Sequence, residues 1–279
     1  MHFPRYWTTA KRGDVSAWGW SEESLAQAEG KATERLSRIL DRLARGAKTS
    51  AQRYGYDRPM REEVLREFRA ATGTLRAAVT RNSYGCLVLN TTDLMFIDVD
   101  APEARESSFL AGLFGFRRPD KRRRPEDFTD GLMARIQQWL TIRPDWGWRV
   151  YLTRAGMRLV ATQQPITPDD SACKEAFEAF ESDPLYRRMC SSQKCFRARL
   201  TPKPWRCGMD KPRGRWPWAN GKTETRFRQW EAKYLAAAKD YATCNLMGLY
   251  GNKDMDPSFL ELVGFHDEIT RSQSGLPLA

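Results

Sequence analysis

The chain has 279 residues, of which 41% are hydrophobic and 29% are charged, and its formal net charge is +11. This composition is typical of a soluble globular protein and argues against extensive disorder. No apolar run approaches the roughly 18 residues that a membrane span needs, so we expect no membrane partner. The first residues, MHFPRYWTTAKRGD, lack the apolar region of a secretory signal, which predicts a cytoplasmic location.

The N-terminal third predicts a short aromatic sheet followed by a helix. The aromatic residues up to Trp20 favour one or two short strands. A helix is expected from about Ser21 to Gly46, because apolar residues recur there at helical spacing between a capping serine and a terminating glycine. Residues 54–69 are expected to form a loop that leads into a short turn or helix.

The centre of the chain alternates predicted hairpins and helices. Residues 83–100 contain two apolar runs separated by NTTD, which indicates a hairpin. A helix is expected at 125–144, a second hairpin at 146–166, a further helix at 168–184, and one more strand near 195–200. A long helix over 221–251 and a final one over 258–272 follow.

This order of elements predicts an α+β fold. We expect a central, mostly antiparallel sheet of the RRM-like or primase-like kind, with helices packed on it and helical additions at both ends. The sheet would contain residues 84–90, 94–100, 148–153, 157–162 and 195–200. Residues 1–82 would be an N-terminal extension, 83–205 the core, and 206–279 a basic aromatic loop with C-terminal helices, all in one unit.

The six cysteines do not resemble a disulfide framework in a chain of this length and expected compartment. Cys190, Cys195 and Cys207 lie close together, but their spacing lacks the paired knuckles of most zinc sites. Buried free thiols are the favoured interpretation. A zinc site completed by Cys244 or His266 is the alternative.

The excess of Lys and Arg suggests a polyanionic partner, for which nucleic acid is the first candidate. The densest run, RRPDKRRRPED at 117–127, reads as a loop that either touches phosphates or is simply solvated. A second basic stretch, TPKPWRCGMDKPRGRWPW, mixes arginines with tryptophans that can stack unpaired bases. The alternative for this stretch is a surface loop held by its own tryptophans.

Two aspartates mark the end of the apolar run LMFIDVD. Asp98 and Asp100 are two residues apart, so on a strand they point to the same face. One interpretation is a divalent metal held between the carboxylates. The other is an exposed turn, because the chain runs directly into Pro102.

Cations stand at the ends of neighbouring predicted strands. Arg154 and Arg158 flank the turn of the second hairpin, and the last strand brings further basic residues, which are Lys194, Arg197, Arg199 and Lys203. If these strand ends converge, carboxylates would hold a metal and arginines would hold the phosphates of a triphosphate.

The segments MFIDVD, RVYLTRAGMRLV and DPLYRRMCSSQKCFRARLTPKP follow one another in this order. They resemble three motifs of the archaeo-eukaryotic primase superfamily, which includes the primase-polymerases. The resemblance covers roughly residues 84 to 205. It implies that Asp98 and Asp100 bind metal and that the glycine-containing hairpin contacts the incoming nucleotide. The strand with Phe196, Arg197 and Lys203 resembles the basic strand that follows these motifs in the primase-polymerases.

The chain departs from this pattern at two positions. Arg158 stands where the superfamily has a histidine, so nucleotide contact would run through an arginine. Asp183 is the best-placed third acid, although the sequence SDPL is also an ordinary turn.

The resemblance therefore implies a primase- or polymerase-like nucleotidyltransferase, or a degenerate relative of one. It would act on nucleic acid and a nucleoside triphosphate by two-metal catalysis with Mg²⁺ or Mn²⁺. The rival is a non-catalytic nucleic-acid-binding or replicon accessory protein with a basic surface. The expected catalytic residues are Asp98, Asp100 and Asp183. The expected nucleotide-binding residues are Arg154, Arg158, Arg197, Arg199 and Lys203. The expected nucleic-acid-binding residues are Lys194, Trp205, Arg206, Arg213, Arg215 and Trp216.

Overall fold

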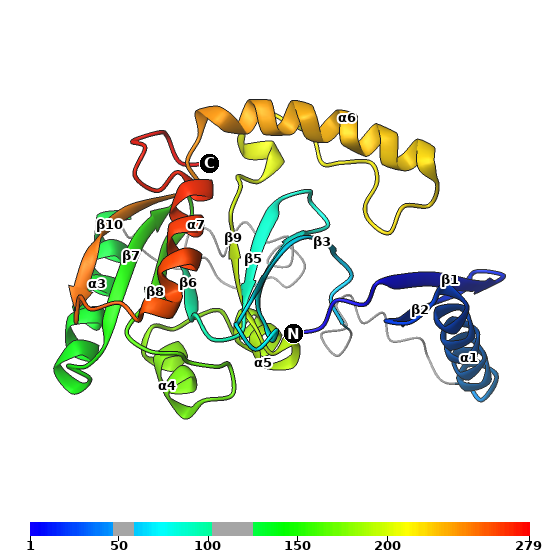
Figure 1. The fold of residues 1–279 in the computed structure, drawn as a ribbon, viewed down its shortest axis with the longest axis horizontal. Helices are drawn as coiled ribbons and strands as arrows, with labels where there is room; N and C mark the ends of the chain where they lie inside the picture. The colour runs from blue at the N-terminus through cyan, green and yellow to red at the C-terminus, as the bar shows by residue number, and fades with distance from the viewer. Residues whose placement is uncertain (47–58, 102–124) are drawn as a thin grey trace.

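The computed structural model describes residues 1–46, 59–101 and 125–279 (Figure 1). Most of the basic run at 117–127 lies outside these residues. Within them, ten strands form three antiparallel sheets and the helices pack around them, which confirms the expected α+β class. None of the helices in the described ranges combines the length and apolarity that crossing a bilayer requires.

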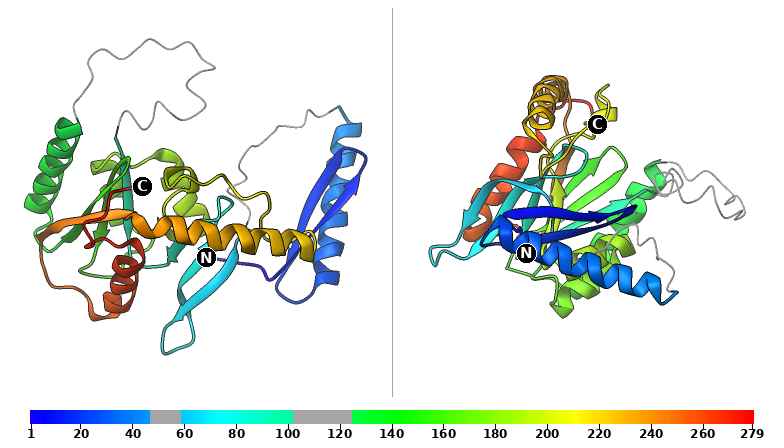
Figure 2. Two further views of the ribbon diagram at one scale, coloured as in Figure 1. Left: turned by 90° about the horizontal axis from the view of Figure 1, so that it is seen from above. Right: turned by 90° about the vertical axis from the view of Figure 1, so that its right-hand side faces the viewer.

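The first sheet is a two-stranded hairpin that carries one helix. It consists of β1 (Tyr6–Arg12) and β2 (Val15–Ser21), and α1 (Leu25–Ala44) packs on one of its faces. The side chain of Ser24, rather than the expected Ser21, caps α1 by accepting a hydrogen bond from the backbone N–H of Gln27. Gly19 allows the close approach, because a Cβ there would lie 2.0 Å from the carbonyl oxygen of Ala28. We call β1, β2 and α1 the ββα unit; it stands at one end of the molecule (Figures 1 and 2).

The second and third sheets have four strands each. The order in the second sheet is β3 (Glu63–Arg69), β4 (Leu75–Arg81), β5 (Leu87–Thr91) and β9 (Phe196–Arg199). The order in the third sheet is β10 (Cys244–Gly251), β7 (Gly147–Thr153), β8 (Gly156–Ala161) and β6 (Phe96–Asp100). The main helices of this part are α3 (Pro125–Ile142), α4 (Ser171–Ala179), α5 (Pro184–Gln193), α6 (Gly221–Ala237) and α7 (Leu260–Thr270).

The expected single central sheet is thus divided in two, and the expected hairpin at 83–100 is wrong. β5 pairs with β4 and β9, whereas β6 pairs with β8 in the other sheet. The segment between β5 and β6 is held in place by Asp93, which accepts hydrogen bonds from the guanidinium of Arg76 at 3.1 and 3.0 Å. Arg76 lies 17 positions earlier in the chain, so the local sequence pattern does not reveal this contact. The expected boundary at residue 82 falls between two strands, β4 and β5, that pair with each other.

Three further expectations are corrected by strand pairing. Residues 63–69 form β3, not a turn or helix, and β4 beside it was not expected. The long helix expected over 221–251 ends at Ala237, and its last third is strand β10, which pairs with β7. Asp183, for which an ordinary turn was the alternative to a third acid of the site, is the N-cap of helix α5. The helix at 125–144, the hairpin at 146–166, the helix at 168–184 and the final helix are confirmed.

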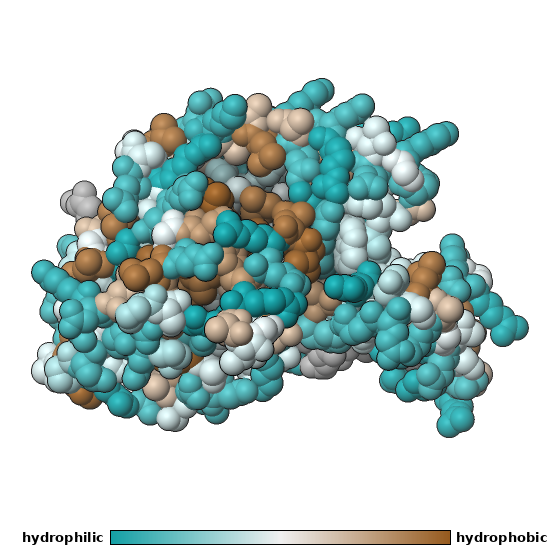
Figure 3. Space-filling view, viewed as in Figure 1, coloured by the Kyte–Doolittle hydropathy of each residue, from teal (hydrophilic) through white to brown (hydrophobic). Residues whose placement is uncertain are grey.

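The core extends across both four-stranded sheets. Phe96, Ile97 and Val99 of β6 are buried in it, and the same cluster contains aromatic side chains that include Trp146, Trp148 and Phe180. The Tyr186 hydroxyl lies 3.0 Å from the carbonyl oxygen of Phe96 on β6 and 3.2 Å from that of Arg197 on β9. It therefore bridges the two sheets where they separate. Apolar side chains also gather in the middle of one face, below α6, while the periphery is mostly hydrophilic (Figure 3).

Candidate functional site

The two aspartates of β6 lie at the open end of the third sheet. In the register of β6 and β8, Asp98 stands opposite Arg158 and Asp100 opposite Gly156. Asp98 is half-buried and Asp100 is exposed. The guanidinium of Arg158 donates to both carboxylate oxygens of Asp98, at 2.8 and 3.2 Å. The prediction that an arginine of this hairpin reaches the aspartates is confirmed.

Arg158 is itself an interior residue, only 2% exposed. Its Nη1 donates to the carbonyl oxygen of Arg199 at 3.0 Å and to Nε2 of His266 at 3.2 Å. Burial lowers the pKa of Arg158, but the Asp98 carboxylate outweighs that effect and the pKa is raised. The guanidinium is therefore charged and directed at Asp98 and the interior, not outward toward a nucleotide.

His266 continues this chain of contacts from α7. An arginine cannot accept a hydrogen bond, so Nε2 of His266 is the acceptor and its proton resides on Nδ1. Nδ1 lies 3.0 Å from Asp267, which also accepts from the Tyr151 hydroxyl at 2.7 Å and forms an ion pair with Arg149. Burial lowers the pKa of His266 and keeps the ring neutral. The sequence alone pointed to His266 only as an alternative zinc ligand, because Arg158, its partner on Nε2, is 108 positions away.

Basic side chains gather beside the aspartates. We call Arg154, Arg199, Lys203 and Arg206 the cationic cluster. Burial and the neighbouring guanidinium of Arg199 lower the pKa of both Lys203 and Arg206, and Asp100 acts in the opposite direction on each. Arg154 also lowers the pKa of Arg206. These electrostatic interactions indicate that three segments lie close together: the end of β6, the β7–β8 turn and the segment after β9.

Two nitrogens of the cationic cluster are buried without partners. Nε of Arg199 and Nη1 of Arg206 have no hydrogen-bond acceptor within the described part of the chain. Burial lowers the pKa of Arg199, and Arg158 lowers it further. A buried cationic nitrogen without an acceptor is unfavourable for folding. The arrangement is one that a bound anion would complete.

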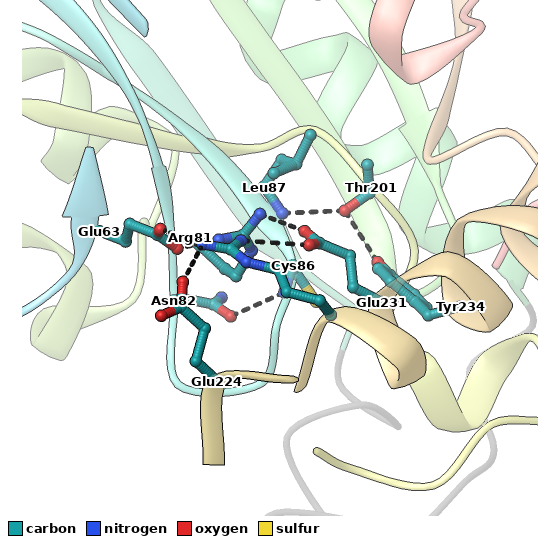
Figure 4. Close-up of polar contacts among 10 residues, drawn as sticks. Glu63, Arg81, Asn82, Cys86, Leu87, Thr201, Glu224, Glu231 and Tyr234 are labelled. Atoms are coloured by element: carbon teal, nitrogen blue, oxygen red, sulfur yellow. Dashed lines mark hydrogen bonds and ion pairs between the residues drawn. The ribbon is translucent and has the colours of Figure 1, made fainter. Parts of the chain in front are cut away.

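The segment that carries Lys203 and Arg206 is held firmly against α6 and β5. The Tyr234 hydroxyl of α6 lies 2.8 Å from that of Thr201, and Thr201 accepts from the backbone N–H of Leu87 at 2.9 Å (Figure 4). The middle of α6 is fixed by an ion-pair network in which Arg81 joins Glu63 of β3 to Glu231. The cations therefore project from a rigid support.

An exposed aromatic ring borders the cationic cluster. Trp205 is 45% exposed and packs edge-on against Tyr84, with ring centroids 5.3 Å apart. The ammonium of Lys211 lies 5.0 Å from the centre of the Trp205 ring, and that of Lys203 lies 5.6 Å from it. A flat, partly exposed indole among cations is suited to stacking a base.

Several residues expected in the site have other partners. Both nitrogen-to-oxygen contacts of Arg197 with Glu62 measure 2.7 Å, and the side chain is mostly buried. Lys194 pairs with Asp169 on the surface. Asp183 caps α5, accepting from the backbone N–H of Leu185 at 2.6 Å. These contacts give each of the three side chains a structural role.

The basic aromatic loop before α6 contains both exposed and half-buried side chains. Arg213 and Arg215 are exposed. Trp216 is half-buried and lines a small pocket with Arg61 and Arg81.

The donors near Asp98 fit a cation that arrives with phosphates, but not a cation held by protein alone. Among the described residues, no group of three or more acidic, His or Cys side chains is placed to hold a metal. Mg²⁺ typically uses one or two carboxylates together with waters and substrate phosphates, which Asp98 and Asp100 beside the cationic cluster can satisfy.

All six thiols are buried and unbridged, and burial raises the pKa of Cys195 to about 11, which disfavours a thiolate ligand.

No family model, curated protein or solved structure matches the chain.

Proposed function

We propose that the protein is a primase-like nucleotidyltransferase that uses a nucleoside triphosphate and acts on nucleic acid with Mg²⁺ or Mn²⁺. One observation carries the proposal. Two aspartates at the end of β6 adjoin a cationic cluster in which Nε of Arg199 and Nη1 of Arg206 are buried without hydrogen-bond partners in the described residues.

The phosphates would bind at the cationic cluster. Arginine is suited to phosphate because its planar guanidinium offers several donors in a fixed geometry. A triphosphate would relieve the repulsion between Arg199, Lys203 and Arg206, and it would supply acceptors for the two buried nitrogens once the side chains over them move aside. The exposed face of Trp205 would stack the base of a bound nucleotide or of a template strand.

The carboxylates would complete the site. Asp98 and Asp100 would hold the divalent cation, which lowers the pKa of an attacking hydroxyl and neutralises charge on the phosphates. Arg158 orients Asp98 from the interior, and His266 and the carbonyl of Arg199 orient Arg158 in turn. Hydrogen bonds to a metal-binding carboxylate from residues outside the metal's own ligands keep that carboxylate in one orientation.

A specific feature favours the non-catalytic rival. Both carboxylate oxygens of Asp98 already accept hydrogen bonds from Arg158, and Asp183 is used as a helix cap. A chain with this arrangement can bind phosphates at the cationic cluster without transferring nucleotides.

Nucleotide binding tests the cationic cluster independently of catalysis. In Arg199→Met, we expect the affinity for a nucleoside triphosphate to fall by about 1.5–3 kcal/mol, the range for hydrogen bonds to charged groups. The same variant should unfold at a higher temperature than the wild type, because a buried nitrogen without a partner has been removed. The matched control is Arg213→Met, an exposed arginine of the nearby loop, which should change neither quantity. Unchanged affinity in Arg199→Met refutes the proposed phosphate site.

Activity separates the enzyme from its rival. The assay is manganese-dependent primer synthesis and extension, comparing the wild type with Asp100→Asn. Asp100 is preferred to Asp98, because removing the Asp98 carboxylate leaves the buried charge of Arg158 unpaired and endangers folding. We expect incorporation by the wild type and a loss in the variant. Nucleotide binding with no incorporation by the wild type would favour the non-catalytic rival.

A further inference from the structure

A second surface with the chemistry of nucleic-acid recognition lies on the ββα unit, apart from the aspartates. A groove of about 420 Å³ runs between β2 and α1. Trp18 and Trp20 line it from the strand, and Arg35, Arg38 and Arg42 line it from the helix. No carboxylate is among its lining residues in the described part of the chain.

The three arginines follow one face of α1. Their spacing of three and four residues places them one turn apart, so they span about 10 Å along the helix axis. Arg38 pairs with Glu34, but both side chains are 65% exposed, and such a pair is readily exchanged for another anion. Arg42 is exposed in the last turn, where the helix dipole also favours a cation. That dipole effect explains a basic residue at the helix end, but not two more along the same groove.

The tryptophans form the opposite wall. Trp18 and Trp20 are half-buried, and both pack against Trp7, with centroids 6.2 and 5.2 Å away. The guanidinium of Arg35 lies 3.3 Å from the centre of the Trp20 ring, and that of Arg61 lies 3.9 Å from the Trp18 ring. The indoles are thus held in place by packing and by stacked cations, with part of each ring exposed.

We propose that this groove binds single-stranded nucleic acid. Arg38 and Arg42 supply contacts for successive phosphates, Arg35 holds Trp18 and Trp20 in position, and the exposed indole surface supplies a stacking face for unpaired bases. A duplex keeps its bases stacked on one another and cannot use the tryptophans in this way. An acidic polypeptide would satisfy the arginines but has no base to stack. The site shares no residue with the cationic cluster, so it stands whether or not the proposed transferase activity holds.

The test measures binding by the anisotropy of labelled single strands, both DNA and RNA, as the salt concentration is varied. The charge variant is Arg38→Gln/Arg42→Gln, and the matched control on the same helix is Lys31→Gln/Arg45→Gln, whose residues do not line the groove. We expect the charge variant to bind about ten-fold or more weakly and to lose roughly 1.4 from the slope of log affinity against log salt, since each single-strand phosphate contact contributes about 0.7. The control should keep a slope closer to that of the wild type.

An abasic strand of equal length and poly-glutamate separate stacking from charge. We expect both to bind the wild type about ten-fold or more weakly than the normal strand. Equal binding of either one, or wild-type binding by the charge variant, overturns the proposal. Nucleoside triphosphate affinity, measured on the same charge variant, should be unchanged, so this groove and the cationic cluster can fail separately.

Discussion

Replacing Arg158 by methionine tests how much the buried hydrogen bonds behind Asp98 contribute to stability. Methionine retains an apolar stem of similar length, so the main loss is the guanidinium and its hydrogen bonds to Asp98, Arg199 and His266. Asp98 is partly exposed, with 37% of its side chain accessible, and can turn to water. The ring nitrogen of His266 and the carbonyl oxygen of Arg199 are less accessible to water, so they would be left without a hydrogen-bond donor. Each of these two interior acceptors costs about 1–3 kcal/mol when it is left without a donor, so we expect a loss of about 2–6 kcal/mol in the free energy of unfolding.

The measurement is urea unfolding followed by tryptophan fluorescence. Arg38→Met is the comparison, because it breaks an exposed pair of the same chemical type and should lose less than about 1 kcal/mol. Arg158→Lys should fall between the two, since an ammonium keeps the charge but not the planar fork. A loss below about 1 kcal/mol in Arg158→Met would refute the reasoning, because the interior hydrogen bonds would then contribute nothing measurable.

Three further outcomes follow from the same contacts. Burial lowers the pKa of His266, so below its ordinary value of about 6.5 the unfolded chain binds more protons than the folded one. The free energy of unfolding should therefore fall as the pH drops from about 7.5 to about 5.5, and His266→Gln should lack this part of the fall in urea titrations at each pH. In Gly156→Ala the new Cβ would lie 2.0 Å from the carbonyl oxygen of Val99, so the thermal midpoint should drop; an unchanged midpoint would mean that β6 and β8 separate easily. In the ββα unit, Gly19→Ala should lower the stability of the protein for the same reason. The Cβ of Gly30→Ala meets no atom within 4 Å, so this variant should be more stable by about 0.5–1 kcal/mol. Equal effects of the two substitutions in calorimetry would contradict the packing of α1 on β2.

Local pattern was enough for many elements. The helical spacing of apolar residues located α1, α3 and α7, and the glycine turn located the β7–β8 hairpin. The alternation of residues along β6 correctly put Asp98 and Asp100 on the same side of the strand. These features depend on residues close in sequence, or on the two-residue period of a strand, and neither needs knowledge of the partner elements.

Local pattern misjudged the strands at the sheet edges. Residues 63–69 and 244–251 contain good helix formers, and in each case pairing with a neighbouring strand outweighs that preference. The same limitation affected the site. Arg197 and Arg199 alternate identically on β9, yet Glu62 pairs with the first while Nε of the second has no acceptor in the described residues.

The sequence by itself determined the α+β class, most helices, the D-x-D strand end and the excess of positive charge. Only the tertiary structure decided that the strands divide into two sheets, that His266 stands behind Arg158, and that Arg206 joins Arg199 beside the aspartates. The physical reason is the range of the interactions. Periodicity and capping act over a few residues, whereas ion pairs, burial and strand pairing join residues that lie far apart in the chain and depend on how the whole core packs.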